Sequence, residues 1–285
     1  MSKKHLSSWL LLMLAICGTA STDGPSSHHR LIEGTPVTGF NRLFGNPVWN
    51  FGPLGTPGYS TVQAFNPGGS QPLPLTAASA PSTLLATYID PFWFRVTGID
   101  PATVADRFNI PLRDVPVIVD PFGKTEALPP LEEGTELDFT QAASNGPITL
   151  GNWLQARGVL DIRCDRKGSS ARFQFHRLIP NGLYSVWVGF QTNFGGSPFL
   201  GIGPLGGVPN AFTADDDGRA TFERQLNFCP IDLGPNDAPV VVVDVVFHSN
   251  QQLYGARPSL PRVSVFSGAV SHSQLNFLIS GKPAQ

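Results

Sequence analysis

The chain has 285 residues, which is long enough for one large or two modest domains with a real hydrophobic core. Charged residues are 14% of the total and the formal net charge is −2, so the chain has no basic field that could attract nucleic acid or anionic lipid. The 30 Gly, 27 Pro and 20 Phe favour short strands joined by many turns, which predicts an all-β protein.

The first 20 residues have the three parts of a secretory signal peptide. Lys3 and Lys4 form a positive start, residues 9–16 form an apolar run, and the small residues Gly18-Thr19-Ala20 end the segment. The run is too short to cross a bilayer, and no later stretch reaches the roughly 20 apolar residues that a transmembrane helix needs. We therefore expect a secreted, periplasmic or cell-envelope protein without a membrane span.

The cysteines fit an exported chain. Leu14-Ala15-Ile16-Cys17 resembles a lipobox, but Ile16 stands where that motif has Gly, Ala or Ser, which disfavours a lipid anchor at Cys17. Removal of the signal peptide leaves Cys164 and Cys229. An even pair in an oxidising compartment predicts a disulfide between them, and the alternative is two separate buried thiols.

Composition divides the remaining chain into three parts. Residues 21–35 are small and polar and are typical of a flexible leader, whereas residues 36–150 are interrupted by Pro and Gly at short intervals. That second segment is predicted to be irregular, with one short helix that begins after Asp100 and with short strands. The strand candidates in it are residues 84–89, 92–96 and 115–119.

Residues 151–285 alternate apolar and polar residues, as half-buried strands do. Asp215-Asp216-Asp217-Gly218 is predicted to be a tight hairpin turn with a positive φ at Gly218, and residues 199–205 a long apolar loop. Six or more strands predict a Greek-key β-sandwich or small barrel in the C-terminal half. The strand candidates are residues 158–164, 173–175, 183–190, 220–228, 240–247 and 275–279.

A family resemblance runs over residues 201–255. Its parts are Gly203-Pro204-Leu205-Gly206-Gly207, Phe212-Thr213-Ala214-Asp215-Asp216-Asp217-Gly218-Arg219-Ala220, residues 243–248 and Leu253-Tyr254-Gly255. Together they resemble the region of copper/zinc superoxide dismutases that runs from a zinc-binding loop through a hairpin to a copper-binding His strand. The resemblance implies an eight-stranded Greek-key barrel and places His248 near a copper-ligand position.

The same resemblance argues against dismutase activity. The position of the family's zinc-ligand Asp corresponds to about Pro204, and its paired His-x-His corresponds to about Tyr184-Ser185-Val186. Cys164 and Cys229 also do not fall where that family has its disulfide. His248 alone cannot build a copper centre, because copper(II) needs several imidazoles in a fixed geometry.

Other candidate sites are weak. His28 and His29 lack the third and fourth ligands of a metal site, and His176, His248 and His272 are predicted to be surface or half-buried structural residues, with His248 on the outward face of its strand beside Asp244. The string Gly201-x-Gly203-x-x-Gly206 lacks the βαβ unit that dinucleotide binding requires. The acidic residues Glu132, Glu133, Glu136 and Asp138 are predicted to be a solvated linker face, with paired-carboxylate catalysis as a remote alternative. No residue is assigned to catalysis, a cofactor or a metal.

These observations favour an exported, non-catalytic β-sandwich that binds a protein, a glycan or an envelope component, or that serves a structural role. The apolar loop 199–205 and Trp49, Trp93 and Trp153 are its candidate contacts. The alternatives are a metal-binding or redox protein related to the dismutase barrel and a hydrolase formed by the N-terminal segment.

Signal cleavage after Ala20 is directly testable. We expect the mature chain to begin at Ser21, because the small residues that a signal peptidase recognises end at Ala20. Intact-mass measurement of the exported protein checks the position, and a diacylated Cys17 would contradict it.

Overall fold

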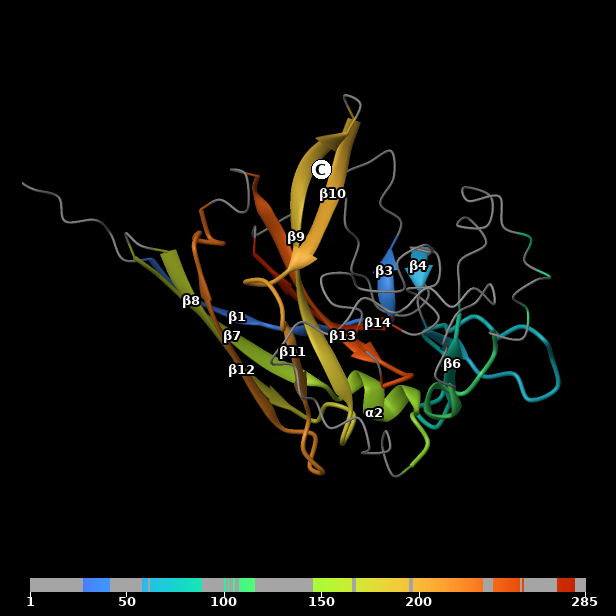
Figure 1. Ribbon diagram of the computed structural model, residues 1–285. Coiled ribbons are helices and arrows are strands. Elements are labelled where there is room, and N and C mark those ends of the chain that lie inside the picture. The colour runs from blue at the N-terminus through green and yellow to red at the C-terminus, as the bar shows by residue number, and fades with distance from the viewer. Residues whose placement is uncertain are drawn as a thin grey trace, which may run out of the picture.

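The computed structural model describes a sandwich of two antiparallel sheets with a set of shorter elements beside it (Figure 1). The described residues are 28–41, 58–60, 62–88, 100, 102, 105, 108–115, 146–165, 168–194, 197–232, 238–251, 253 and 271–279. The predicted all-β sandwich is confirmed, and the two sheets have separate edges rather than closing into a barrel.

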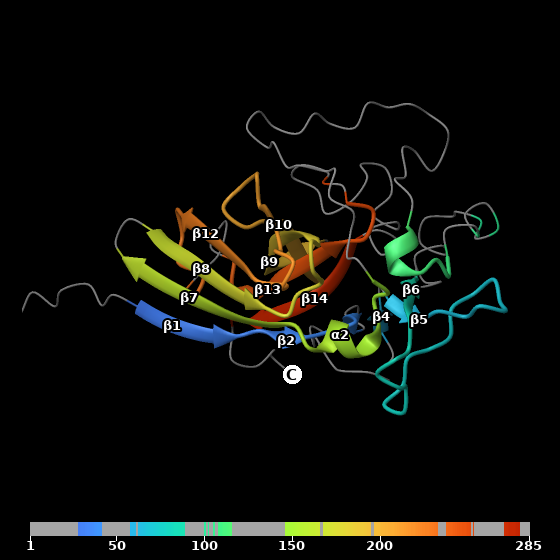
Figure 2. The same ribbon diagram turned by 90° about the horizontal axis from the view of Figure 1, so that it is seen from below.

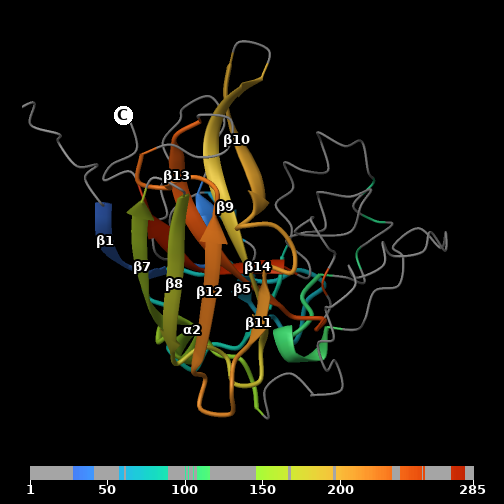
Figure 3. The same cartoon turned by 60° about the vertical axis from the view of Figure 1, so that its left-hand side comes forward.

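The first sheet has four strands in the order β1-β7-β8-β12. Its members are β1 (His28–Glu33), β7 (Arg157–Asp165), β8 (Gly168–His176) and β12 (Ala220–Leu226). Buried and more exposed residues alternate along β7 and β8, as the sequence predicts, so one face packs on the core and the other faces solvent. Figure 3 shows these strands side by side, with β1 at the outer edge.

The second sheet has six strands in the order β10-β9-β13-β14-β2, with β11 also paired to β9. Its members are β2 (Thr35–Pro36), β9 (Leu183–Phe194), β10 (Ser197–Pro204), β11 (Ala211–Thr213), β13 (Val240–His248) and β14 (Ser271–Leu278). Every residue of β13 is buried, so this sheet is covered on both faces there. The links from β8 to β9 and from β12 to β13 each cross between the sheets, as in Greek-key sandwiches.

Aromatic rings fill the space between the sheets. Phe173 and Phe175 of β8 meet Phe277 of β14 edge-on, with ring centroids 5.4 and 6.4 Å apart, and Phe212 of β11 stacks on Phe175 at 4.8 Å. Gly158 lies beneath two of these rings, because a Cβ there would be 2.8 Å from Phe277 and 2.9 Å from Phe175. Such ring pairs add to the large hydrophobic contribution of burying each side chain.

The shorter elements come from the Pro/Gly-rich segment, except that α2 continues past its end at residue 150 (Figure 2). They include a predicted strand, since β6 falls within residues 84–89. The helix expected after Asp100 lies mostly outside the described residues, as do residues 92–96 and 116–119. The elements are β3 (Gly39–Asn41), β4 (Gly58–Ser60), β5 (Val62–Ala64), β6 (Leu85–Thr87), the 3-10 helix η2 (Leu112–Asp114) and the α-helix α2 (Leu150–Leu154).

A bulge in β14 joins this segment to the sandwich. Gln274 has no cross-strand partner on β13, and its side chain accepts a hydrogen bond from the Tyr184 hydroxyl at 2.7 Å and donates one to the Trp153 carbonyl at 3.1 Å. The Gln274 carbonyl accepts from the Val37 amide at 2.8 Å. Trp153 in turn donates its indole N–H to the Val37 carbonyl at 2.7 Å. The bulge thereby satisfies several buried polar groups at once.

Two sequence-based boundaries need correction. Residues 28–33, expected in a flexible leader spanning 21–35, form β1, and the sandwich expected to begin at residue 151 also takes β2 from this region. The sequence does not predict β1 because small polar residues surround it and only one face of the strand is buried. On that face Ile32 lies in the core and Arg30 donates to the Ile279 carbonyl at 2.6 Å. Residues 36–150 therefore stand between strands of one sandwich.

No helix within the described ranges is long and apolar enough to cross a membrane. The predicted signal peptide, including Cys17, lies outside those ranges.

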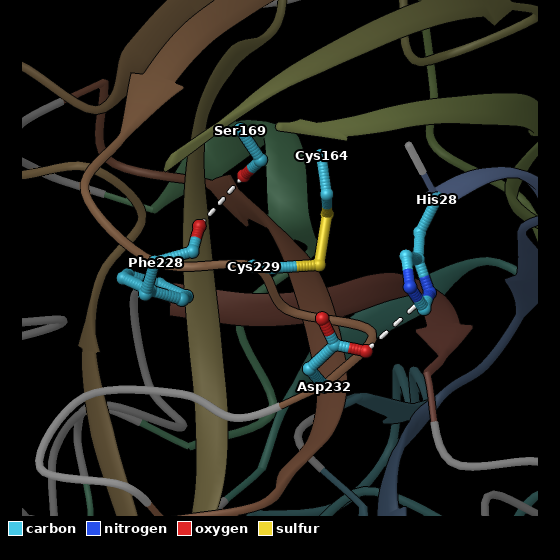
Figure 4. The surroundings of a disulfide bond; sticks show 6 residues. All are labelled: His28, Cys164, Ser169, Phe228, Cys229 and Asp232. Carbon is cyan, nitrogen blue, oxygen red and sulfur yellow. Dashed lines mark hydrogen bonds and ion pairs between the residues drawn. A yellow bond between two sulfur atoms is a disulfide. The ribbon is translucent and has the colours of Figure 1, made fainter. Parts of the chain in front are cut away.

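The predicted disulfide between Cys164 and Cys229 is present (Figure 4). Cys164 is near the end of β7 and Cys229 follows β12, and their Cα atoms are 5.5 Å apart. Ser169 of β8 lies between these strands and donates to the Phe228 carbonyl at 2.7 Å. The bond therefore holds β7 to the chain leaving β12, across the start of β8.

Loss of this disulfide should destabilise the sandwich. The bond closes a loop of 65 residues, so the Cys164→Ser/Cys229→Ser variant should lose about 4 kcal/mol of unfolding free energy through the greater entropy of its unfolded chain. Urea denaturation measures the difference. Reductant should lower the unfolding free energy of the native protein to that of the variant and leave the unfolding free energy of the variant unchanged. Equal unfolding free energies of the native protein and the variant without reductant would contradict the prediction.

Candidate functional site

The predicted histidine candidates lie in three different places. His176 is exposed at the end of β8, whereas His248 and His272 are buried on the neighbouring strands β13 and β14. His28 pairs with Asp232 at 3.5 Å and His29 with Asp161 at 2.9 Å. The structure thus brings His248 and His272 near each other and leaves the others apart.

His248 and Asp244 were expected on an outward face, and both are buried. They belong to a group of side chains on the face of β9, β13 and β14 that points away from the aromatic core, here named the polar layer. The sequence does not predict the polar layer. Four consecutive Val residues in β13 indicate a buried strand, but they do not show that the polar residues of the same strand are buried as well. The polar layer consists of Ser185, Trp187, Asp244, His248, Ser271, Ser273 and Asn276.

His248 has a serine hydroxyl beside each of its ring nitrogens. The Trp187 indole N–H donates to the Ser185 hydroxyl oxygen at 2.7 Å, and this oxygen is 2.6 Å from Nε2 of His248. On the other side of the ring, Nδ1 is 3.4 Å from the Ser271 hydroxyl oxygen, so a neutral ring can donate from one nitrogen and accept at the other. Burial lowers the pKa of His248 to about 3, with a smaller contribution from His272, so the ring is neutral.

Asp244 is the acidic member of the layer. The Ser273 hydroxyl donates to its carboxyl, but burial outweighs this bond and raises the pKa of Asp244 to about 7. Trp187 and Asn276 stand opposite it on the two flanking strands. Within the described part of the chain, the side-chain amide of Asn276 finds no hydrogen-bond partner for either its nitrogen or its oxygen.

The polar layer contains side chains of the kinds found in catalytic sites, but these side chains are not accessible from solvent. A serine hydroxyl hydrogen-bonded to a neutral histidine is the pairing that activates nucleophilic serines. However, Ser185 and His248 are each only 1% exposed, and the Trp187 N–H already binds the serine oxygen. We interpret the pair as a structural one, since buried polar groups need partners of this kind.

The positions singled out by the dismutase resemblance hold other contacts. His248 lies beside residues 184–186 of β9, but its neighbour there is the Ser185 hydroxyl. Tyr184 points its hydroxyl at Gln274, and Pro204 ends β10 opposite Trp187. Among the described residues, no three His, Cys, Asp or Glu side chains are grouped so as to hold a metal ion.

Residues 199–205 are not the apolar loop that the sequence suggests. They lie mostly in β10, which forms a long hairpin with β9 that rises from the sandwich (Figure 1). The sequence does not predict this strand because Gly and Pro residues, which are uncommon in strands, occur close together in it. Gly201 is needed there because the Phe190 ring lies over it, and a Cβ at this position would be 2.3 Å from the ring. Trp153 is buried, so it is not a surface contact, and Trp49 and Trp93 lie outside the described residues, as does the acidic run 132–138.

The aspartate-rich turn is partly as predicted. Gly218 has a φ of +72°, and Asp215 caps the turn by accepting from the amides of Asp217 and Arg219 at 3.0 and 2.6 Å. The turn links β11 to β12, which belong to different sheets, so it is not a hairpin. Its leading carboxylate is satisfied by the backbone of the turn itself.

The exposed face of the four-stranded sheet, here named the open face, is the accessible candidate. The register places Asp161, Arg172 and Glu223 in one row across β7, β8 and β12, with Val159, Gln174 and Thr221 in the next. Asp161 also binds Arg163 at 2.9 Å, and that hydrogen bond is the main reason that its pKa is lowered. The face thus presents charges of both signs in a fixed order.

Comparisons with protein families, with curated proteins and with solved structures find no match for this chain.

The two buried ionisable groups give opposite pH dependences. The raised pKa of Asp244 contributes stability that is present at low pH and is lost as the pH rises through about 7. The lowered pKa of His248 contributes stability that is present above the usual His range and is lost as the pH falls towards about 3.

Single variants should separate these effects. Between pH 4.5 and pH 6.5, both within the range where the two groups oppose each other, Asp244→Asn should become more stable as the pH rises, because only the His248 contribution remains. His248→Gln should become less stable over the same range, because only the Asp244 contribution remains. Urea denaturation at each pH gives the slopes, and slopes of the same sign would contradict the assignment.

Proposed function

We propose that this chain is an exported, disulfide-stabilised β-sandwich that acts by binding a protein partner through its open face. Support for export comes from the signal-like segment ending at Ala20 and from the Cys164–Cys229 bond, since disulfides persist in oxidising compartments.

The observation that carries the binding role is the contrast between the two sheets. The side chains with catalytic or ligand chemistry on the six-stranded sheet, such as His248 and Asp244, are buried and hydrogen-bonded within the polar layer. The four-stranded sheet instead presents Arg172, Gln174 and Glu223 to solvent at fixed strand spacing.

The chemistry of the open face favours a protein over a glycan. One of its rows places the basic Arg172 between the acidic Asp161 and Glu223, which suits electrostatic complementarity with another protein surface. No Phe, Trp or Tyr of β1, β7, β8 or β12 is exposed, so these strands offer no large ring on which a sugar could stack. The alternative of a metal or redox centre draws no support from His248, because each of its ring nitrogens lies beside a serine hydroxyl.

Site-specific crosslinking in the native host tests the proposal. A photoreactive residue in place of Gln174, at the centre of the open face, should give one discrete adduct with a different protein. Reversal of the neighbouring charge by Arg172→Glu should reduce the adduct about tenfold, because it places like charges against the partner.

Arg113→Glu is the matched control, since Arg113 is an exposed arginine in η2 and away from the open face, and it should leave the adduct unchanged. Absence of an adduct, an adduct only with a glycan, or equal loss in both variants would overturn the proposal.

A further inference from the structure

Among the residues that the structure describes, no strand pairs with the outer edge of β1. The amide of Gly34 donates to the Gly158 carbonyl at 2.9 Å, which sets the alternation of the β1–β7 ladder. By that alternation Arg30 and Ile32 direct their backbone groups to β7, whereas His29, Leu31 and Glu33 direct theirs away from the sheet.

The other edges of the sandwich are shorter, interrupted or partly covered. β2 is two residues long and includes Pro36, and β10 includes Pro198 and Pro204, which lack an amide N–H. The chain at Gly206 lies against β12, close enough that a Cβ there would be 3.3 Å from the Gln225 carbonyl. β1 has six residues, no proline and no register shift against β7, so its ladder edge is uninterrupted, and its charged residues are Glu33 and the inward-pointing Arg30.

Apolar side chains flank this edge on the open face. Leu31 is 63% exposed and Val159 is 39% exposed. Val159 stands opposite Glu33 in the ladder and is therefore the diagonal neighbour of Leu31. Two of the large apolar residues most exposed in the described part of the chain thus lie next to the same open edge.

We propose that β1 pairs antiparallel with β1 of a second copy of this chain, about a two-fold axis at Leu31. The pairing joins two four-stranded sheets into one continuous sheet. It places Leu31 against the second copy's Leu31 and His29 against the second copy's Glu33. Nε2 of His29 binds Asp161 of its own chain, so a protonated ring donates from Nδ1 to the carboxylate on each side of the axis.

The strand's own sequence selects this register. An axis at Arg30 would place two guanidinium groups against each other and would bring backbone groups that already bind β7 to the junction. An axis at Leu31 pairs residues 29–33 of the two copies and forms an apolar strip from Val159 of one copy to Val159 of the other. A single strand-to-strand junction buries a small area, so we expect a dissociation constant in the micromolar range or weaker, on the order of 10 µM.

Sedimentation of the purified exported chain from about 1 to about 500 µM should show a monomer–dimer equilibrium. Leu31→Lys should weaken the dimer about tenfold or more, because it replaces the central apolar pair with two like charges. Leu73→Lys is the matched control, since Leu73 is 52% exposed and lies in the Pro/Gly-rich segment. A protein that stays monomeric throughout, or a dimer that Leu31→Lys leaves unchanged, would overturn the proposal.

A mixing experiment tests the register itself. Glu33→Lys alone and His29→Glu alone should each weaken the dimer about tenfold, since each homodimer loses both complementary pairs. An equimolar mixture of the two variants should recover native-like association, because every position 29 then meets an opposite or hydrogen-bonding group at position 33. Circular dichroism confirms that each variant is folded, and a mixture no tighter than the separate variants would overturn the register.

Hydrogen exchange gives a local readout. The amides of His29, Leu31 and Glu33 should be protected at high concentration and exchange freely on dilution or in Leu31→Lys. Protection that does not depend on concentration would show that the edge is already covered and would overturn the proposal.

Discussion

Burial of both faces of the six-stranded sheet is the constraint on which the rest of this structure depends. One face of β13 packs on the aromatic core and the other carries Asp244 and His248, and both sides are closed to solvent. Polar groups in such a position must find partners inside the protein, because an unpaired buried donor or acceptor costs free energy. The serine-rich neighbours of His248 and Asp244 supply those partners, and this is why chemically capable side chains form a structural network.

The same constraint explains the bulge at Gln274. In a regular β14 the direction of the Gln274 side chain would be set by the alternation of the strand. The bulge changes that direction, so that the side-chain amide can bind Tyr184 and Trp153. Through Trp153 and Val37 the bulge connects the sandwich with the segment inserted between β2 and β7. The inserted segment and the sandwich are therefore linked by buried hydrogen bonds as well as by the chain itself.

Sequence patterns predicted the parts of the fold that depend on local alternation. Residue spacing over a few positions predicts the strands β7, β8 and β12 and the turn glycine Gly218. The expected oxidising compartment predicts the Cys164–Cys229 disulfide. Strands β1 and β10 were missed because flanking polar or Gly and Pro residues dominate their composition, and their pairing is decided by distant strands. The polar layer was missed for a related reason: whether Asp244 and His248 face solvent depends on tertiary cover, which strand periodicity does not encode.

The position of the disulfide also limits how far the chain can be extended by force. The bond joins two cysteines that are 65 positions apart, and the loop between them includes β8, β9 and β12, so pulling on the two ends of the protein cannot stretch that loop. At about 3.4 Å for each extended residue, the fully unravelled chain is shorter by about 220 Å than its reduced form. Tension applied through the termini would be transmitted through the disulfide and not through the loop that it closes. The strands β8 and β12, which form the centre of the open face, would remain within that covalently closed loop.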